Sequence, residues 1–133
     1  MSQTTTQDRS TKTANNTNVR IDELIRYIQN GRILDAMNEF YAPDVRMQEN
    51  GNAPTVGLAA NVDRERQFLA GVKEWKAFDV LSKAVSSDVS FVENRLEFVA
   101  ADGTTVRMQQ VSVARWRDGQ IVDERFYYDS GAK

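Results

Sequence analysis

The sequence predicts an α+β fold in which a curved antiparallel sheet is wrapped around three helices from the N-terminal half of the chain. Helical periodicity is confined to the part of the chain before Trp75, and four strand-like segments follow it. The dipeptides Asp102-Gly103 and Asp118-Gly119 are typical of tight hairpin turns, so consecutive strands are expected to pair. Helices that precede a run of strands are typical of α+β domains.

The chain of 133 residues is long enough for one domain with one hydrophobic core. Residues 1–18 are mainly Ser, Thr, Asn and Gln. A segment with so little apolar surface to bury does not offset the entropy that it loses on ordering. We therefore expect residues 1–18 to form a flexible polar tail and residues 19–133 to form the folded domain.

The first helix is predicted over residues 19–31. Asn18 is a suitable N-cap, and Asn30-Gly31 is a suitable C-terminal end. One face of this helix is apolar and carries Ile21, Leu24, Ile25 and Ile28.

A second short helix follows and ends before Pro43, because a residue that precedes proline disfavours the helical conformation. Its apolar stripe is Ile33, Leu34, Met37 and Phe40 or Tyr41. Residues 44–49 predict a short strand with Val45 and Met47 on one side. Residues 50–57 predict a loop, and residues 58–72 predict the third helix.

The remaining chain predicts four strands, within residues 76–87, 88–103, 104–119 and 120–129. Alternation puts three charged residues on one face of the second of these strands, namely Glu93, Arg95 and Glu97. We expect this face to point outward and to pair with arginines of neighbouring strands, namely Arg107, Arg115 or Arg125. The opposite register, which would give a strongly charged cavity, stays open.

The composition excludes several kinds of site. The chain has no cysteine and no histidine, so it has no thiol nucleophile, no Ser-His or Cys-His pair and no His- or Cys-ligated metal. A formal net charge of −2 gives no reason to expect binding to nucleic acid or to an anionic membrane. No apolar run approaches the roughly 20 residues of a membrane helix, and the N-terminus lacks a signal-peptide core, so a cytoplasmic protein is expected.

Three segments resemble a known superfamily: "EFYAPDVRMQENG", "VGLAANVDRERQFL" and "VARWRDGQIVDERFYYD". They are similar to the nuclear transport factor 2-like superfamily with its cystatin-like cone fold, most of all to SnoaL-like domains and more weakly to ketosteroid isomerases. The resemblance covers the chain from about Val19 and implies a conical cavity that is open at one end. This fold hosts isomerases, cyclases, dehydratases, hydrolases and non-catalytic domains, so it does not fix a reaction.

Three residues are candidates for catalysis. The resemblance places the proton-shuttling carboxylate of the isomerases at Glu49, and an apolar cavity rim independently favours a carboxylate as a base there. The resemblance to the isomerases also implies Tyr27 as a hydrogen-bond donor to an oxyanion. The resemblance to the SnoaL-like cyclases implies Asp129 as a general acid-base. Each candidate also has an interpretation without a functional role: Glu49 as a solvated glutamate, Tyr27 as a half-buried tyrosine of a helix, and Asp129 as an aspartate of a frayed C-terminus.

Alternate residues of one strand are expected to line the cavity, namely Met108, Gln110, Ser112, Ala114 and Trp116. Ser112 stands where the isomerases hold a protonated aspartate, and its hydroxyl is a weaker donor. The candidate ligand-binding residues are Tyr41, Met47, Trp75, Met108, Gln110, Ser112 and Tyr128. The aromatic residues favour a flat apolar or aromatic ligand.

Two classes of function follow. One is a cofactor-independent isomerase or cyclase that transfers a proton on an apolar carbonyl compound by means of a carboxylate. The other is a non-catalytic dimeric domain that binds a ligand or assists another protein. In both classes we expect a homodimer through the outer sheet face around Val111 and Val113, as the resemblance also implies.

Overall fold

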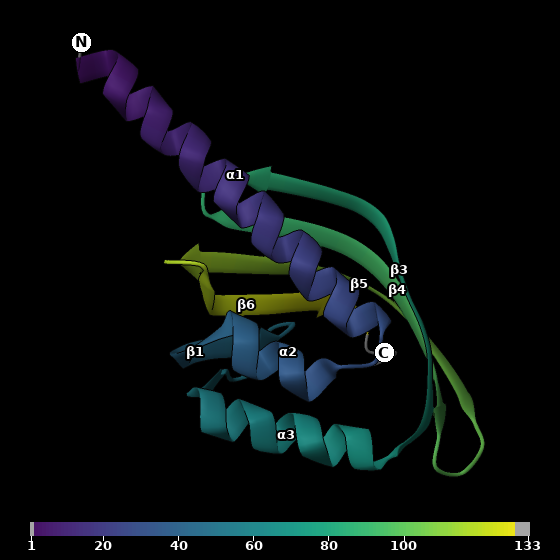
Figure 1. Ribbon diagram of the computed structural model, residues 1–133. Helices are drawn as coiled ribbons and strands as arrows, with labels where there is room; N and C mark the ends of the chain where they lie inside the picture. Colours follow the sequence, from purple (N-terminus) through teal and green to yellow (C-terminus); the bar gives the residue numbers. More distant parts are fainter. Residues whose placement is uncertain (1, 130–133) are drawn as a thin grey trace.

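The computed structural model describes residues 2–129 of the 133, and its order of elements confirms the α+β fold (Figure 1). The helices are α1 (Ser2–Gln29), α2 (Ile33–Phe40) and α3 (Leu58–Ala70). The strands are β1 (Tyr41–Glu49), β2 (Thr55–Val56), β3 (Val72–Ser86), β4 (Val89–Ala100), β5 (Thr105–Arg117) and β6 (Gln120–Tyr128). In the part of the chain described, no helix combines the length and the apolar character needed to cross a membrane.

The strands form one sheet in the order β2-β1-β6-β5-β4-β3. The strands β3 to β6 form the predicted antiparallel meander, with turns at Asp102-Gly103 and Asp118-Gly119. The pairing of β1 with β6 is parallel, which the sequence did not predict. Three register shifts in β3 bend that strand, and the long strands β3 and β4 curve strongly in Figure 1.

Helix α1 begins at Ser2, inside the segment for which the sequence predicts a flexible tail, and its first turns extend beyond the sheet in Figure 1. The prediction that Asn18 caps the helix is wrong, because Asn18 lies in the helix interior. Its amide donates to the carbonyl oxygen of Ala14 at 3.2 Å, and Thr17 donates in the same way to Thr13 at 2.9 Å. Such bonds let Ser, Thr and Asn remain within a helix, and extending an existing helix needs no new nucleus.

The inner face of the sheet and the apolar faces of the helices form the core. Phe40, Val45 and Ile121 are fully buried there. The outer face carries Glu93 and Arg95, as predicted, and Arg107 donates to Glu97 at 2.8 Å. The alternative register with a strongly charged cavity is therefore wrong.

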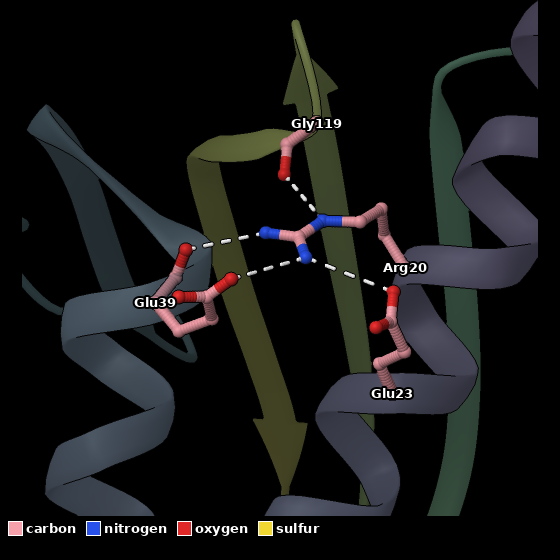
Figure 2. A network of polar contacts seen from close by, with 4 residues as sticks. All are labelled: Arg20, Glu23, Glu39 and Gly119. Atoms are coloured by element: carbon pink, nitrogen blue, oxygen red, sulfur yellow. Dashed lines mark hydrogen bonds and ion pairs between the residues drawn. The ribbon is translucent and has the colours of Figure 1, made fainter.

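Arg20 joins three parts of the fold (Figure 2). Its Nε donates to the carbonyl oxygen of Gly119, in the β5–β6 turn, at 2.9 Å. Its terminal nitrogens reach the carbonyl oxygen and a carboxylate oxygen of Glu39, at 3.2 and 3.4 Å, and lie 3.7 Å from Glu23. The guanidinium also lies over the ring of Phe40, 4.3 Å from its centroid. These contacts fix α1 against the end of α2 and against the sheet.

Candidate functional site

A cavity of about 270 Å³ lies between the helices and the inner face of the sheet. Its walls are mainly apolar and include Leu24, Ile25, Met37, Phe78, Val92 and Leu96. Helix α3 contributes four lining residues with the spacing of one helical face, Asn61, Arg64, Glu65 and Phe68. Three of these four are polar, so α3 provides much of the polar lining.

The two strands β1 and β6 bring two carboxyl groups to the same cavity. In their parallel register Met47 pairs with Glu124, and Glu49 pairs with Phe126. All four residues line the cavity. Glu49 and Glu124 are thus offset by two residues on neighbouring strands, which puts their Cα atoms about 8 Å apart for a rise of about 3.3 Å per residue and a strand spacing of about 4.8 Å.

Glu124 is the most deeply buried carboxyl group of the cavity. Only 4% of the residue is exposed, and its carboxylate accepts a hydrogen bond from the hydroxyl group of Tyr41. Burial raises the pKa of Glu124 to about 7; the Tyr41 bond opposes this rise, and the negative charges of Glu65 and Asp123 add to it. Burial and the adjacent Glu124 also raise the pKa of Tyr41 well above its usual value.

Glu49 lies at the mouth of the cavity, with 38% of its side chain exposed. One carboxylate oxygen accepts a hydrogen bond from the Tyr128 hydroxyl at 2.8 Å, and the other pairs with the guanidinium of Arg64. Burial and the bond to Glu49 raise the pKa of Tyr128. The carboxylate of Glu49 is therefore positioned by one guanidinium group and one hydroxyl group.

Glu65 is the third carboxyl group that lines the cavity. Burial raises its pKa, Arg64 opposes this rise, and the charge of Glu49 adds to it. Among residues 2–129, no group of three or more His, Cys, Asp or Glu side chains is arranged to hold a metal ion.

The other two catalytic candidates, Tyr27 and Asp129, are not among the residues that line the cavity. The ring of Tyr27 packs edge-on against Phe40, 5.1 Å between centroids, and lies beneath the guanidinium of Arg32. Asp129 is exposed and follows the last residue of β6. Of the three candidates, only Glu49 is among the lining residues.

Most of the candidate ligand-binding residues do line the cavity, namely Tyr41, Met47, Trp75, Met108, Gln110 and Ser112. Tyr128 contacts the site through Glu49. Trp75 donates its indole N–H to the carbonyl oxygen of Ile28 at 2.9 Å, so its polar atom is already paired. Ala114 and Trp116, which were expected in the lining, belong to the core outside the cavity.

Sequence reasoning missed Glu124, Glu65, Asn61 and Asn94. A signal for Glu124 existed, because alternation along β6 places it on the same face as Phe126 and Tyr128. The sequence analysis named no site residue in the third helix, whereas the cavity face of α3 carries Asn61 and Glu65.

The SnoaL-like domain family matches residues 21–124 of the chain. None of the curated proteins searched matches it. Solved structures share the fold at low sequence identity. An NTF2-like protein of unknown function from Burkholderia pseudomallei is 18% identical, with a TM-score of 0.76 over 87% of this chain and 92% of that one.

Two further structures extend this comparison. An LEH-like epoxide hydrolase from M. tuberculosis is 15% identical, with a TM-score of 0.73 over 87% of this chain and 84% of that one. A hypothetical protein with a ketosteroid isomerase-like fold, from Catenulispora acidiphila, is 14% identical, with a TM-score of 0.64 over 73% of this chain and 75% of that one. The predicted resemblance in fold and family is confirmed.

Proposed function

This chain belongs to the SnoaL-like domain family, and from that premise we propose that it moves a proton on an apolar carbonyl compound bound in its cavity. The proposed reaction class is a cofactor-independent isomerisation or cyclisation. Its elementary step is the formation of an enol from a ketone. Relatives with this fold carry different chemistries, so the proposal rests on the site and not on the fold.

The observation that carries the proposal is the buried Glu124. A carboxyl group with a pKa of about 7 has both its protonated and its charged form populated near neutral pH. It therefore supplies the near-neutral acid-base group that a protein without histidine otherwise lacks. The hydroxyl group of Tyr41 fixes the position of this carboxyl group.

Glu124 is buried, whereas Glu49 is partly exposed and paired with Arg64. These different environments favour Glu124 as the acid and Glu49 as the base. The carboxylate of Glu49, which is paired with Arg64, takes the proton from the carbon next to the carbonyl group. The electron pair of that C–H bond forms a carbon–carbon double bond, and the carbonyl oxygen takes the proton of Glu124. The Cα atoms of the two residues lie about 8 Å apart across the two strands, a spacing compatible with a substrate carbonyl group between the two side chains.

The second candidate function is ligand binding without turnover. The observation that favours it is that both oxygens of Glu49 already have partners, Arg64 and Tyr128. A base held in this way must first be released by the substrate. Turnover and binding therefore have to be measured separately.

The test is hydrogen–deuterium exchange at the carbon next to the carbonyl group of apolar ketones such as 2-tetralone, followed by NMR in heavy water. We expect the protein to accelerate exchange. Glu124→Gln and Glu49→Gln should each slow the catalysed exchange by about 10²–10⁴-fold, while ketone binding changes little. Glu93→Gln, on the outer face, is the matched control and should leave exchange unchanged. Ketone binding without any acceleration would support the binding function instead.

A further inference from the structure

Glu65 is a carboxyl group of the cavity to which the proposed reaction gives no role. It lines the cavity from α3, whereas Glu49 and Glu124 line it from β1 and β6. The side chain is partly buried, between the exposed mouth residue Glu49 and the deeply buried Glu124 in its exposure. A third carboxyl group therefore faces the bound ligand, and it comes from the helical layer and not from the sheet.

The carboxyl group of Glu65 is also the one that is free to contact a ligand. Those of Glu49 and Glu124 already accept hydrogen bonds within the protein. Among residues 11–129, whose side chains the structure describes, none donates a hydrogen bond to Glu65 or forms an ion pair with it. Arg64 acts on Glu65 through its charge alone. Glu65 can therefore approach a ligand without first breaking a contact.

Contacts on both sides of Glu65 fix the position of α3. One turn earlier, the amide of Asn61 donates to the carbonyl oxygen of Gly57 at 2.8 Å. One turn later, the ring of Phe68 packs edge-on against Phe98, with 5.2 Å between the ring centroids. A reacting group works best on such a rigid element, because small displacements of a reacting group slow a reaction strongly.

The environment of Glu65 suits a base. Burial raises the pKa of Glu65, so its carboxylate binds a proton more strongly than that of an ordinary solvated glutamate. A ketone has two carbons next to its carbonyl group, one on each side. Glu49 and Glu65 belong to different layers of the fold, so they approach a bound ketone from different directions.

We propose that Glu65 is a second catalytic base, which takes a proton from the carbon on the side of the carbonyl group that Glu49 does not serve. The electron pair of that C–H bond forms a carbon–carbon double bond, and the carbonyl oxygen takes the proton of Glu124. The reverse transfers return the protons to the carbon and to Glu124. This inference rests on the proposed function and extends it, because the enol then forms toward either side of the carbonyl group.

The experiment follows deuterium uptake at C1 and at C3 of 2-tetralone separately, by NMR in heavy water. We expect the wild-type protein to accelerate exchange at both carbons. Glu65→Gln should slow exchange at one of them by about 10²–10⁴-fold and change the other little, and Glu49→Gln should do the opposite. Glu65→Asp keeps a carboxylate and should restore part of the lost rate. Asp63→Asn, which changes an exposed carboxylate of the same helix, should leave both rates unchanged.

The ratio of the two rates separates a catalytic role from a structural one. A loss of stability or affinity slows both carbons together, so equal slowing in Glu65→Gln would overturn the inference. Unchanged rates in this variant, or wild-type acceleration at one carbon only, would overturn it as well and leave the proposed function standing. Exchange that needs Glu65 but not Glu49 would support this inference and remove Glu49 from the proposed reaction. No acceleration by the wild-type protein would contradict both proposals.

Discussion

At the scale of single residues, Glu124 links the candidate chemistry to stability. Its pKa is 4.5 in its ordinary state and about 7 in the folded protein, so the folded state binds the proton more tightly. The stabilisation from this proton is fully present below pH 4.5 and is lost as the pH rises through about 7. The loss amounts to about 3 kcal/mol, because each pKa unit corresponds to about 1.4 kcal/mol.

We therefore predict that Glu124→Gln flattens the pH dependence of stability, because glutamine does not titrate. The free energy of unfolding, measured in urea near pH 5 and near pH 8, should fall less between the two values in the variant than in the wild-type protein. The variant should be the more stable protein near pH 8. Glu93→Gln, which changes an exposed carboxylate, should keep the wild-type slope. A slope in Glu124→Gln equal to that of the wild type would contradict the buried, raised pKa.

The site residues that the sequence predicted are identified by local patterns, whereas those that it missed depend on contacts that exist only in the folded protein. Met47, Met108 and Ser112 were found because strand alternation alone determines which face a side chain occupies. The importance of Glu124 depends on its burial and on Tyr41, a partner 83 residues away in the chain.

At the scale of elements, local signals predicted most of the fold. The Asn30-Gly31 turn and the two Asp-Gly turns mark the ends of elements correctly, whereas Pro43 lies within β1, which begins three residues earlier than the predicted strand at residues 44–49. The parallel pairing of β1 with β6 could not be found in this way, because it joins strands about 70 residues apart and has no turn to announce it. The start of α1 was missed because polar residues give no periodic apolar signal.

Arg20 gives a prediction at this scale, because it connects α1 with α2 and with the β5–β6 turn (Figure 2). Arg20→Ala removes hydrogen bonds to the carbonyl oxygens of Gly119 and Glu39, leaving both without this donor. We expect a loss of about 1–3 kcal/mol in the free energy of unfolding, measured in urea. Arg26→Ala, an exposed arginine of the same helix, should cost less than about 0.5 kcal/mol. Equal effects of the two variants would mean that the Arg20 contacts do not stabilise the fold.

At the scale of the whole molecule, the outer face of the sheet carries a group of exposed apolar side chains. Phe91, Val111 and Tyr127 are between 36% and 43% exposed. Val111 pairs in register with Tyr127, and Phe91 pairs with Val113, so these residues are neighbours on three adjacent strands. The helices cover the opposite face, and large exposed apolar groups are often sites of association.

We therefore propose a homodimer through this outer face. A stable dimer typically buries about 1,600 Å² in total, and its apolar centre does not tolerate an unpaired charge. Val111→Arg should convert the dimer into a monomer in sedimentation experiments at micromolar concentration. Val56→Arg introduces the same charge at an exposed valine of β2 and should leave the dimer intact. A wild-type monomer, or a dimer that survives Val111→Arg, would exclude assembly through this face. The cavity faces the helices, so ketone binding should persist in the monomeric variant.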